Sequence, residues 1–437
     1  MPEKKVQSSL DRLKNHIEAN SYLGWDPYDG LTSPLFRLPV LRSNKTIRFL
    51  AQQAIKRSPV NLRPLLGIRK AVNPVTLGLC IQGYAYLSQV FPADKEAYRR
   101  KVLELSDNLI LLSPYFNPEL NLLSTLHSPL FTRDTYSGAC WGYPFDWQAR
   151  NAAIPAFQPT VVATGIIVHA LFEAWHLLGL EKCRELIVSA ADFVLNDLNR
   201  TYDRDTFCFS YSPFDQQQVL NASMKGARIL VQAAASVSSH SSPAARHSSP
   251  VTRHSSPVTR HLSPVTFTLN DNYTEPAKKA ASFVIMHQHM DGSFPYSLAK
   301  GGGWSDSYHT GYVLDCLEEY IRLTGDESKM PELTRGFGFF KENFIADGRI
   351  PKINAGRTYP VDCTAAGQVI LTLCRFGEFE LAGQVASWTI DHMQSTNGHF
   401  YYKRPTANGQ RPTDFMRWSD AWMFAALAFL LKSTEHG

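Results

Sequence analysis

The chain has 437 residues, of which 44% are hydrophobic and 12% aromatic, which suits one large toroid or two ordinary domains and excludes a disordered or fibrous chain. The net charge of +5 is small and the basic residues are scattered, so it favours an acidic partner only weakly and indicates no nucleic-acid surface. The seven cysteines form no CxxC pair and no zinc set with nearby histidines, and we expect neither a metal nor another cofactor.

The N-terminal residues, MPEKKVQSSLDRLKNHIEA, predict a charged amphipathic helix without the apolar stretch of a signal peptide. No apolar run is expected to reach the length of a membrane span. Cys80, Cys183, Cys316 and Cys374 lie in apolar helical stretches, where a free thiol packs as a small hydrophobic side chain. We therefore expect a protein of the reducing cytoplasm.

Helical periodicity dominates the rest of the chain, and the helices come in pairs. The first helix of each pair is rich in small and apolar residues, as in TVVATGIIVHALFEAWHLLG, whereas the second carries more charge, as in EKCRELIVSAADFVLNDL. An apolar helix suits an inner ring that is buried on most sides, and an amphipathic helix suits an outer ring. The predicted pairs are 74–90 with 94–111, 157–178 with 181–197, 217–236 with 272–289, 305–324 with 331–345, and 361–375 with 378–393.

The last predicted helix, 414–432, has no successor in the chain. Its partner should be an N-terminal helix, either 4–19 or 44–57, and this pairing would close a ring. Six such pairs predict an all-α fold, an (α/α)6 toroid of six helical hairpins with long aromatic loops on one face. We expect residues 1–437 to form this single domain, with few strands.

The links between the helices differ in length in a regular way. Links within a pair are mostly short, such as LGLE, whereas links from an outer helix to the next inner helix are long and aromatic, the longest being 112–156. Loops of that length in a compact domain usually carry function. In a toroid they emerge at the N-terminal ends of the inner helices, and we expect the functional site there.

One link within a pair is long. Residues 238–265 repeat the heptad RHSSPVT, in which the proline prevents a continuous helix and no position is apolar enough for a coiled-coil seam. We interpret the segment as a disordered His/Ser/Pro insertion on the face opposite the site, in preference to a histidine cluster that binds metal or anions.

Side chains suited to chemistry gather where the long loops enter the inner helices. Trp and Tyr rings with Asp, His and Arg between them suit a saccharide, because sugar C–H faces stack on rings and hydroxyl groups need polar partners. Each Asp taken alone is also explained as a helix N-cap. The candidates for substrate binding are Trp25, Asp26, Trp141, Tyr143, Asp146, Tyr211, Trp304, Arg357, Arg417 and Trp418. The candidates for catalysis are Asp306, Tyr308, His309, Tyr359, Asp362 and Asp420.

The segment GGGWSDSYHTG brings four candidates to the start of one helix. We expect its three glycines to turn the chain and deliver Trp304, Asp306, Tyr308 and His309 to the rim of a central cavity. Asp306 and His309 are three residues apart and share a helix face, so one can orient the other.

Other toroid chemistries lack their motifs here. The sequence contains no DxDD run of a terpenoid cyclase, no zinc set of Cys and His, and no GxxxxGK[ST] phosphate loop.

Three segments, GWDPYDGL, WSDSYHTGYVLDCLEEY and MRWSDAWMFAALA, resemble a bacterial and archaeal family found among polysaccharide-biosynthesis genes. One member of that family is assigned to the extracellular polysaccharide cluster of Vibrio. The resemblance runs from about residue 20 to residue 432, interrupted by the His/Ser/Pro repeat. It implies a toroid of the six-hairpin glycosidase kind that makes or trims surface polysaccharide, and it carries over no catalytic motif.

The leading hypothesis is an acid/base enzyme that acts on a saccharide. A glycoside hydrolase would use two of the candidate carboxylates. An epimerase or lyase would use His309 together with Tyr308 or Tyr359 to move the proton at C5 of a uronate, with Arg357 or Arg417 neutralising the carboxylate. The alternatives are a non-catalytic glycan-binding toroid and, less favoured, a toroid that handles terpenoids or lipids.

We predict that replacing residues 238–265 with a short Gly/Ser bridge leaves thermal stability and activity nearly unchanged. The reason is that no core contacts are lost and a shorter loop costs less closure entropy. Thermal unfolding followed by circular dichroism tests this. A loss of several kcal/mol in the free energy of unfolding would show that the repeat packs on the fold.

Overall fold

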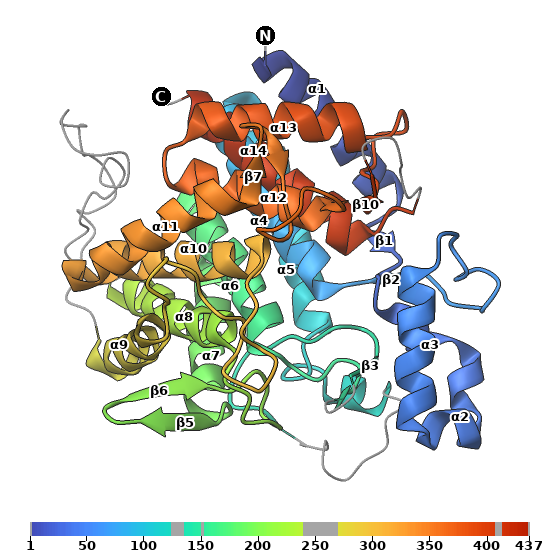
Figure 1. The fold of residues 1–437 in the computed structure, drawn as a ribbon, viewed down its shortest axis with the longest axis horizontal. Helices are drawn as coiled ribbons and strands as arrows, with labels where there is room; N and C mark the ends of the chain where they lie inside the picture. Colours follow the sequence, from blue (N-terminus) through green and yellow to red (C-terminus); the bar gives the residue numbers. More distant parts are fainter. Residues whose placement is uncertain (1, 124–134, 150–152, 239–269, 407–412, 436–437) are drawn as a thin grey trace.

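The computed structural model describes residues 2–123, 135–149, 153–238, 270–406 and 413–435, and the chain is mostly helical (Figure 1). The insertion 238–265 lies outside these residues except for Ser238, which ends a helix. The structure therefore leaves the interpretation of the repeat as a prediction.

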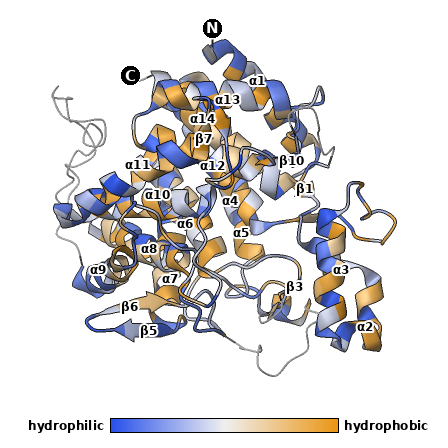
Figure 2. Ribbon diagram, viewed as in Figure 1, coloured by the Kyte–Doolittle hydropathy of each residue, from blue (hydrophilic) through white to orange (hydrophobic). Residues whose placement is uncertain are grey.

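Within the described chain, six helices form an inner ring. Each packs on the next one along the sequence, and the last packs on the first, so the ring is closed. Their surfaces are largely small and apolar, which lets neighbouring helices approach closely, and Figure 2 shows hydrophobic residues concentrated on them. They are α4 (Pro74–Val90), α6 (Val161–Leu178), α8 (Leu220–Ser238), α10 (Ser307–Thr324), α12 (Cys363–Arg375) and α14 (Trp422–Glu435).

A second set of helices covers the inner ring from outside. Each of the first five packs on the inner helix that precedes it, and α1 packs on α14. The (α/α)6 toroid is thereby confirmed. The outer helices are α5 (Lys95–Leu111), α7 (Glu181–Asn196), α9 (Asp271–Met286), α11 (Met330–Phe344), α13 (Phe379–Met393) and α1 (Pro2–Ala19).

The last hairpin therefore joins the two ends of the chain. Of the two partners that the sequence left open for the final helix, the structure selects α1, which buries Val6, Leu10, Leu13 and Ile17 against α13 and α14. The second candidate corresponds to α3 (Lys45–Arg57), which packs with α2 (Pro39–Ser43) beside the ring (Figure 1).

Five inner helices begin later than their periodicity predicts, and α6 and α14 differ most. Helix α6 begins at Val161 because Thr160 is its N-cap, with Oγ1 accepting the N–H of Ala163 at 3.1 Å. The final helix is preceded by a π-helical turn, η9 (Met416–Ala421), a form that is frequent at functional sites. Short 3₁₀ turns also occur at η1 (Asp29–Thr32), η2 (Pro34–Arg37), η3 (Pro92–Asp94), η4 (Pro118–Leu123) and η8 (Glu327–Lys329).

Strands are short, and every sheet among the described residues is an antiparallel pair. Most pairs fall within the long loops or at the ends of helices. The pairs are β1 (Leu23–Gly24) with β2 (Ala71–Val72), β3 (Trp147–Gln148) with β4 (Ala153–Ile154), β5 (Arg200–Asp203) with β6 (Thr206–Phe209), β7 (Ile345–Ala346) with β8 (Ile350–Pro351), and β9 (Val361–Asp362) with β10 (Lys403–Arg404).

The loops at the N-terminal ends of the inner helices are connected by one repeated interaction. The first N–H groups of an α-helix have no partner inside the helix. In four inner helices the N–H of the first residue donates to a carbonyl in the loop that leads to the next inner helix. These bonds run from Val161 to Tyr211 (3.0 Å), from Leu220 to Tyr296 (3.1 Å), from Ser307 to Ile353 (2.9 Å) and from Cys363 to Tyr402 (3.1 Å).

One inner helix has the length and composition of a membrane span, contrary to expectation. It is α6, and 78% of its residues are buried inside the fold. Burial of that extent is what the inner ring of a toroid requires of an apolar helix.

We predict that Gly83→Val destabilises the fold where the ring closes. A Cβ on Gly83 of α4 would lie 2.5 Å from the fully buried ring of Phe424 on α14. Overpacking of this kind typically costs about 1–3 kcal/mol, which urea unfolding would measure. The matched control is Gly383→Ala in α13, where a Cβ meets open space. Equal effects of the two substitutions would argue against tight closure of the ring.

Candidate functional site

The glycine-rich loop before α10 folds back on itself. The N–H of Tyr296 donates to the carbonyl of Trp304 at 2.8 Å, and that of Ser297 donates to the carbonyl of Gly302 at 3.0 Å. Gly301 has φ +83°, and a Cβ on Gly302 would lie 2.0 Å from Ser297 Oγ, so both positions require glycine. The turn stacks Trp304 on Tyr296, with 4.5 Å between ring centroids, and leaves Trp304 46% exposed.

Asp306 and His309 form a dyad at the start of α10. Asp306 is the N-cap, with Oδ1 accepting the N–H of His309 at 2.8 Å, while its Oδ2 lies 2.8 Å from His309 Nδ1. The Asp306 side chain is 4% exposed and that of His309 is 22% exposed. A carboxylate that accepts the Nδ1 proton leaves Nε2 as the basic nitrogen. The capping role and the orienting role of Asp306 are therefore compatible.

Aromatic rings surround His309. The nearest is Tyr308 at 4.3 Å between centroids, followed by Tyr296 at 4.8 Å, Trp304 at 5.6 Å and Tyr312 at 5.9 Å. Burial, and then the charge of Asp306, raise the pKa of Tyr308 well above its usual value of 10.0. A phenolate base requires the opposite shift. Tyr308 therefore stays protonated, and it is better suited to donate a proton than to act as the base that the sequence suggested.

The N-terminal segment folds over the same end of the ring. Tyr28 lies edge-on to Trp418 at 5.7 Å between centroids, and Lys56 of α3 donates to the Tyr28 hydroxyl at 2.5 Å. Burial lowers the pKa of Lys56 to about 8, and Asp362 partly offsets this effect. The segment thus adds an aromatic ring and an amine to the mouth of the toroid.

Arg417 of η9 is clamped by Asp26. Its Nε and one terminal nitrogen lie 2.5 and 2.9 Å from the two Asp26 oxygens, and both side chains are buried. The guanidinium also lies 5.0 Å from the Tyr143 ring centroid and 4.9 Å from that of Trp418. Because Asp26 already neutralises it, Arg417 fixes the N-terminal segment and is a poor partner for a substrate carboxylate.

Asp362 lies at the start of α12. Its Oδ1 accepts the N–H of Thr364 at 3.0 Å and the indole N–H of Trp418 at 2.9 Å, and Lys403 Nζ lies 3.8 Å from Oδ2. Burial raises the pKa of Asp362, and Lys403 partly offsets the increase. A carboxyl group with a raised pKa is suited to donate a proton.

The remaining rim candidates occupy neighbouring loops. Tyr211 is half-buried, and its carbonyl accepts the first N–H of α6. Arg357 is exposed, and Tyr359, which precedes a cis proline, is half-buried; both lie in the loop that leads to Asp362.

Two predicted substrate-binding residues are buried in structural contacts. Trp141 is 0% exposed, and its indole N–H donates to the carbonyl of Leu109 at 2.8 Å, so its ring cannot stack on a sugar. Asp146 is 3% exposed, lies 3.1 Å from Arg48 and accepts the N–H of Ala156 at 2.8 Å. The roles predicted for Trp141 and Asp146 are therefore wrong.

Asp420 does not line the mouth either. Its Oδ1 accepts the N–H of Phe400 at 2.8 Å, and its Oδ2 lies 3.9 Å from His16 Nε2 on the outer helix α1. All three residues, Arg417, Trp418 and Asp420, belong to η9. This π-helical turn directs Arg417 and Trp418 toward the mouth and Asp420 toward α1.

Trp25 lines a separate cleft of about 430 Å3 beside the ring. Three exposed cations, Arg37, Arg69 and Lys70, lie on its walls, as does Asp26. The cations suit an acidic saccharide, but the carboxylates of Asp26 and Asp29 in this cleft are each bound by an arginine. The cleft therefore has cations that suit the binding of a saccharide, but its two carboxylates are not free to act as an acid or a base.

Sequence reasoning missed several rim residues. Tyr28 and Tyr296 lie in the segments GWDPYDGL and DGSFPYS, where an aromatic beside proline in a Gly-rich loop was a usable signal. Lys56 and Lys403 carried no local signal, because their approach to Asp362 depends on how α3 and β10 pack.

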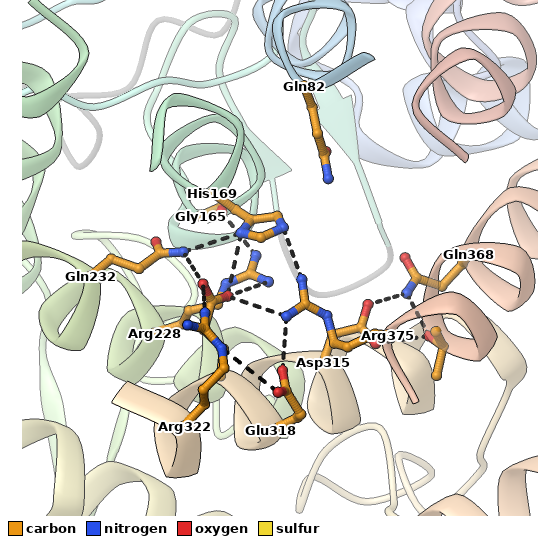
Figure 3. Close-up of polar contacts among 12 residues, drawn as sticks. Gln82, Gly165, His169, Arg228, Gln232, Asp315, Glu318, Arg322, Gln368 and Arg375 are labelled. Atoms are coloured by element: carbon orange, nitrogen blue, oxygen red, sulfur yellow. Dashed lines mark hydrogen bonds and ion pairs between the residues drawn. The ribbon is translucent and has the colours of Figure 1, made fainter. Parts of the chain in front are cut away.

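Below the mouth, charged side chains of the inner helices form a buried network (Figure 3). Arg375 lies 2.8 Å from Glu318 and 3.2 Å from His169 Nε2, and Gln232 lies 3.1 Å from His169 Nδ1. Burial, and then Arg228, lower the pKa of His169 to about 4, so this imidazole is neutral near pH 7. The sequence does contain a signal for this network, namely charged residues within otherwise apolar helices.

The network surrounds a cavity of about 30 Å3 at the centre of the ring. A space of this size holds ordered water and excludes a sugar ring. Asp315, bound by Gln368 at 2.7 Å and Thr372 at 2.9 Å, lies on its wall. The central cavity therefore cannot hold a saccharide, and the exposed Trp304 beside the dyad is the candidate contact surface.

The sequence matches no protein-family model and no curated protein. Solved structures do match. An unsaturated glucuronyl hydrolase specific for heparin superimposes with a TM-score of 0.56 at 11% identity, covering 100% of this chain and 97% of its own. A GH76 α-mannanase of Bacteroides thetaiotaomicron gives 0.54 at 10% identity, covering 82% of this chain and 86% of its own. The cellobiose 2-epimerase of Bacillus thermoamylovorans gives a TM-score of 0.53 at 9% identity, covering 84% of this chain and 88% of its own.

These neighbours share the (α/α)6 toroid fold with this chain. By their names they are a glucuronyl hydrolase, a mannanase and an epimerase, and a D-mannose isomerase has the same fold. Identities near 10% show the fold alone and assign no reaction.

We predict that Lys225 gives folding stability a pH dependence. Its ammonium lies 3.9 Å from the Tyr312 ring centroid beside the central cavity, and burial lowers its pKa from 10.5 to about 7. Between these two values the unfolded chain holds a proton that the folded chain has released, so the free energy of unfolding rises with pH. Urea unfolding from pH 7 to 10 should show this rise relative to Lys225→Met. A pH-independent difference between the two proteins would contradict it.

Proposed function

We propose that the protein is an acid/base enzyme that acts on a saccharide, with His309 as general base and Asp306 as the carboxylate that orients it. The observation that carries the proposal is the 2.8 Å contact between His309 Nδ1 and a buried carboxylate beside an exposed tryptophan. It supplies an oriented base next to a surface on which a sugar ring can stack.

The groups around the dyad support chemistry at C5 of a uronate. His309 Nε2 would take the C5 proton, and the electron pair of the broken C–H bond would pass into the carboxylate to form an enolate-like intermediate. We propose that Lys56, which contacts Tyr28, and Lys403, which lies 3.8 Å from Asp362, offset that charge. A proton returned to the opposite face by a donor such as Tyr308 gives the epimer, whereas loss of the C4 substituent gives the product of a lyase.

The wider role that we propose is the making or modification of surface polysaccharide. It is supported by the resemblance of GWDPYDGL, WSDSYHTGYVLDCLEEY and MRWSDAWMFAALA to the polysaccharide-associated family. Enzymes with this fold act on saccharides, by the names of the neighbouring structures. All seven cysteines are buried and none forms a disulfide, which supports a reducing cytoplasm as the location.

The raised pKa of Asp362 favours a second candidate, glycoside hydrolysis. In that reaction Asp362 would protonate the leaving oxygen, and Asp306 would act as the second carboxylate. The reactions differ in outcome, because epimerisation brings a solvent proton to C5, elimination leaves a C4–C5 double bond, and hydrolysis does neither.

We predict that Asp306→Asn lowers turnover at least about a hundredfold while the fold is kept, as for loss of a general acid or base. Asparagine caps a helix as well as aspartate does but cannot hold the imidazole as a charged partner. Tyr308→Phe tests the proton donor in the same way. The assay is deuterium uptake from solvent into uronate-containing oligosaccharides, followed by NMR.

The matched control is Asp291→Asn, which removes the carboxylate of an exposed loop residue that accepts the N–H of Ser293. Full turnover in both Asp306→Asn and Tyr308→Phe would overturn the site. New reducing ends with neither deuterium uptake nor a C4–C5 double bond, lost in Asp362→Asn, would establish hydrolysis instead. Binding of the oligosaccharide with neither product would establish a glycan-binding toroid.

A further inference from the structure

Four potential metal ligands meet where the two ends of the chain join. His16 lies near the end of α1, His399 lies in the loop before β10, and Asp414 and Asp420 stand on either side of the start of η9. They are far apart in the sequence, so no motif of fixed spacing predicted the cluster.

The ligand atoms are close together. One such atom from each of His16, His399 and Asp414 lies within 4.8 Å of the others. His16 Nε2 is 3.5 Å from Asp414 Oδ2 and 3.9 Å from Asp420 Oδ2. A tetrahedral ion with bonds of about 2.0–2.1 Å sets its ligand atoms roughly 3.3 Å apart, so the ligand atoms would draw together on binding, least at the 3.5 Å contact between His16 and Asp414.

Three atoms of this cluster are buried without a hydrogen-bond partner. They are His16 Nε2, His399 Nε2 and Asp420 Oδ2, and the Asp420 side chain is 0% exposed. Burial of unsatisfied polar atoms costs free energy, and several at one place call for a bound group. Two carboxylates beside two imidazoles suit a dication.

One histidine is also held in the manner of a metal ligand. His399 Nδ1 lies 3.0 Å from Ser395 Oγ, which leaves Nε2 facing the cluster. Metal-bound histidines usually have their second nitrogen fixed by such a contact.

The other such cluster found among the described residues lies among arginine side chains. His169, Glu173 and Glu319 lie in the central network, where Gln232 and Arg375 occupy both nitrogens of His169. The nearby arginine cations would also repel a metal ion.

We propose that His16, His399, Asp414 and Asp420 bind one divalent transition-metal ion of the Zn2+ class. Imidazole nitrogen and carboxylate oxygen in a four-ligand set are typical of zinc. The ion ties α1 to both ends of η9, the turn that carries Arg417 and Trp418 to the mouth of the toroid. The role of the ion is structural, and the presence of this site does not depend on the reaction proposed above.

The test uses the full chain, stripped with a chelator and then incubated with Zn2+. Bound zinc is measured by atomic emission after gel filtration, and Co2+ is added separately to record the visible absorption of a tetrahedral site. We expect zinc to raise the temperature of unfolding of the wild type. We expect His16→Gln and His399→Gln each to weaken zinc binding by more than about a hundredfold, since even outer partners of a ligand contribute about 10–100-fold.

His289→Gln is the matched control, because His289 also lies 2.9 Å from a serine hydroxyl but stands outside the cluster. It should retain zinc like the wild type. Absence of tight zinc binding in the wild type would overturn the proposal. Zinc binding that survives both His16→Gln and His399→Gln would also overturn it, because the ion would then be held elsewhere, for example by the histidines of the 238–265 repeat.

Discussion

The architecture depends on how the inner helices satisfy their first N–H groups. A buried helix N-terminus without partners is unfavourable, and in this ring four inner helices use carbonyls of the loop that leads to the next inner helix. Each of these four helices is thereby fastened to the next hairpin at the end where the loops are long. The same bonds hold the loops of Tyr211 and Tyr296, so one backbone requirement both joins these hairpins and shapes the rim.

The dyad follows from the same constraint. Asp306 is needed as the cap of α10, and its second oxygen is free to hold His309 only because the cap uses the first. Burial then keeps Tyr308 protonated, and Asp26 neutralises Arg417. The base thus stands beside a protonated phenol and several aromatic rings. The charged groups of the central network beneath it pair with one another, around a cavity too small for a sugar.

The fold was predictable because its signal is periodic. Apolar inner helices alternate with charged outer ones, and the long loops all fall at one end. The dyad was predictable from a spacing of three residues on one helix. Asp146 and Trp141 were mispredicted because their partners, Arg48 and the carbonyl of Leu109, come from elsewhere in the fold. Asp420 was mispredicted because a π-helical turn rotates neighbouring side chains to opposite sides. The partner of the last helix was left open since both N-terminal helices are amphipathic.

The central claim is that a saccharide binds at the mouth of the toroid, against Trp304 and His309. The most direct measurement is a crystal structure of the Asp306→Asn protein soaked with a uronate-containing oligosaccharide. The account predicts a sugar ring stacked on Trp304, with a carbon-bound proton or hydroxyl group directed at His309 Nε2 at about hydrogen-bond distance. A sugar bound only in the side cleft lined by Arg37 and Arg69, with His309 untouched, would contradict it.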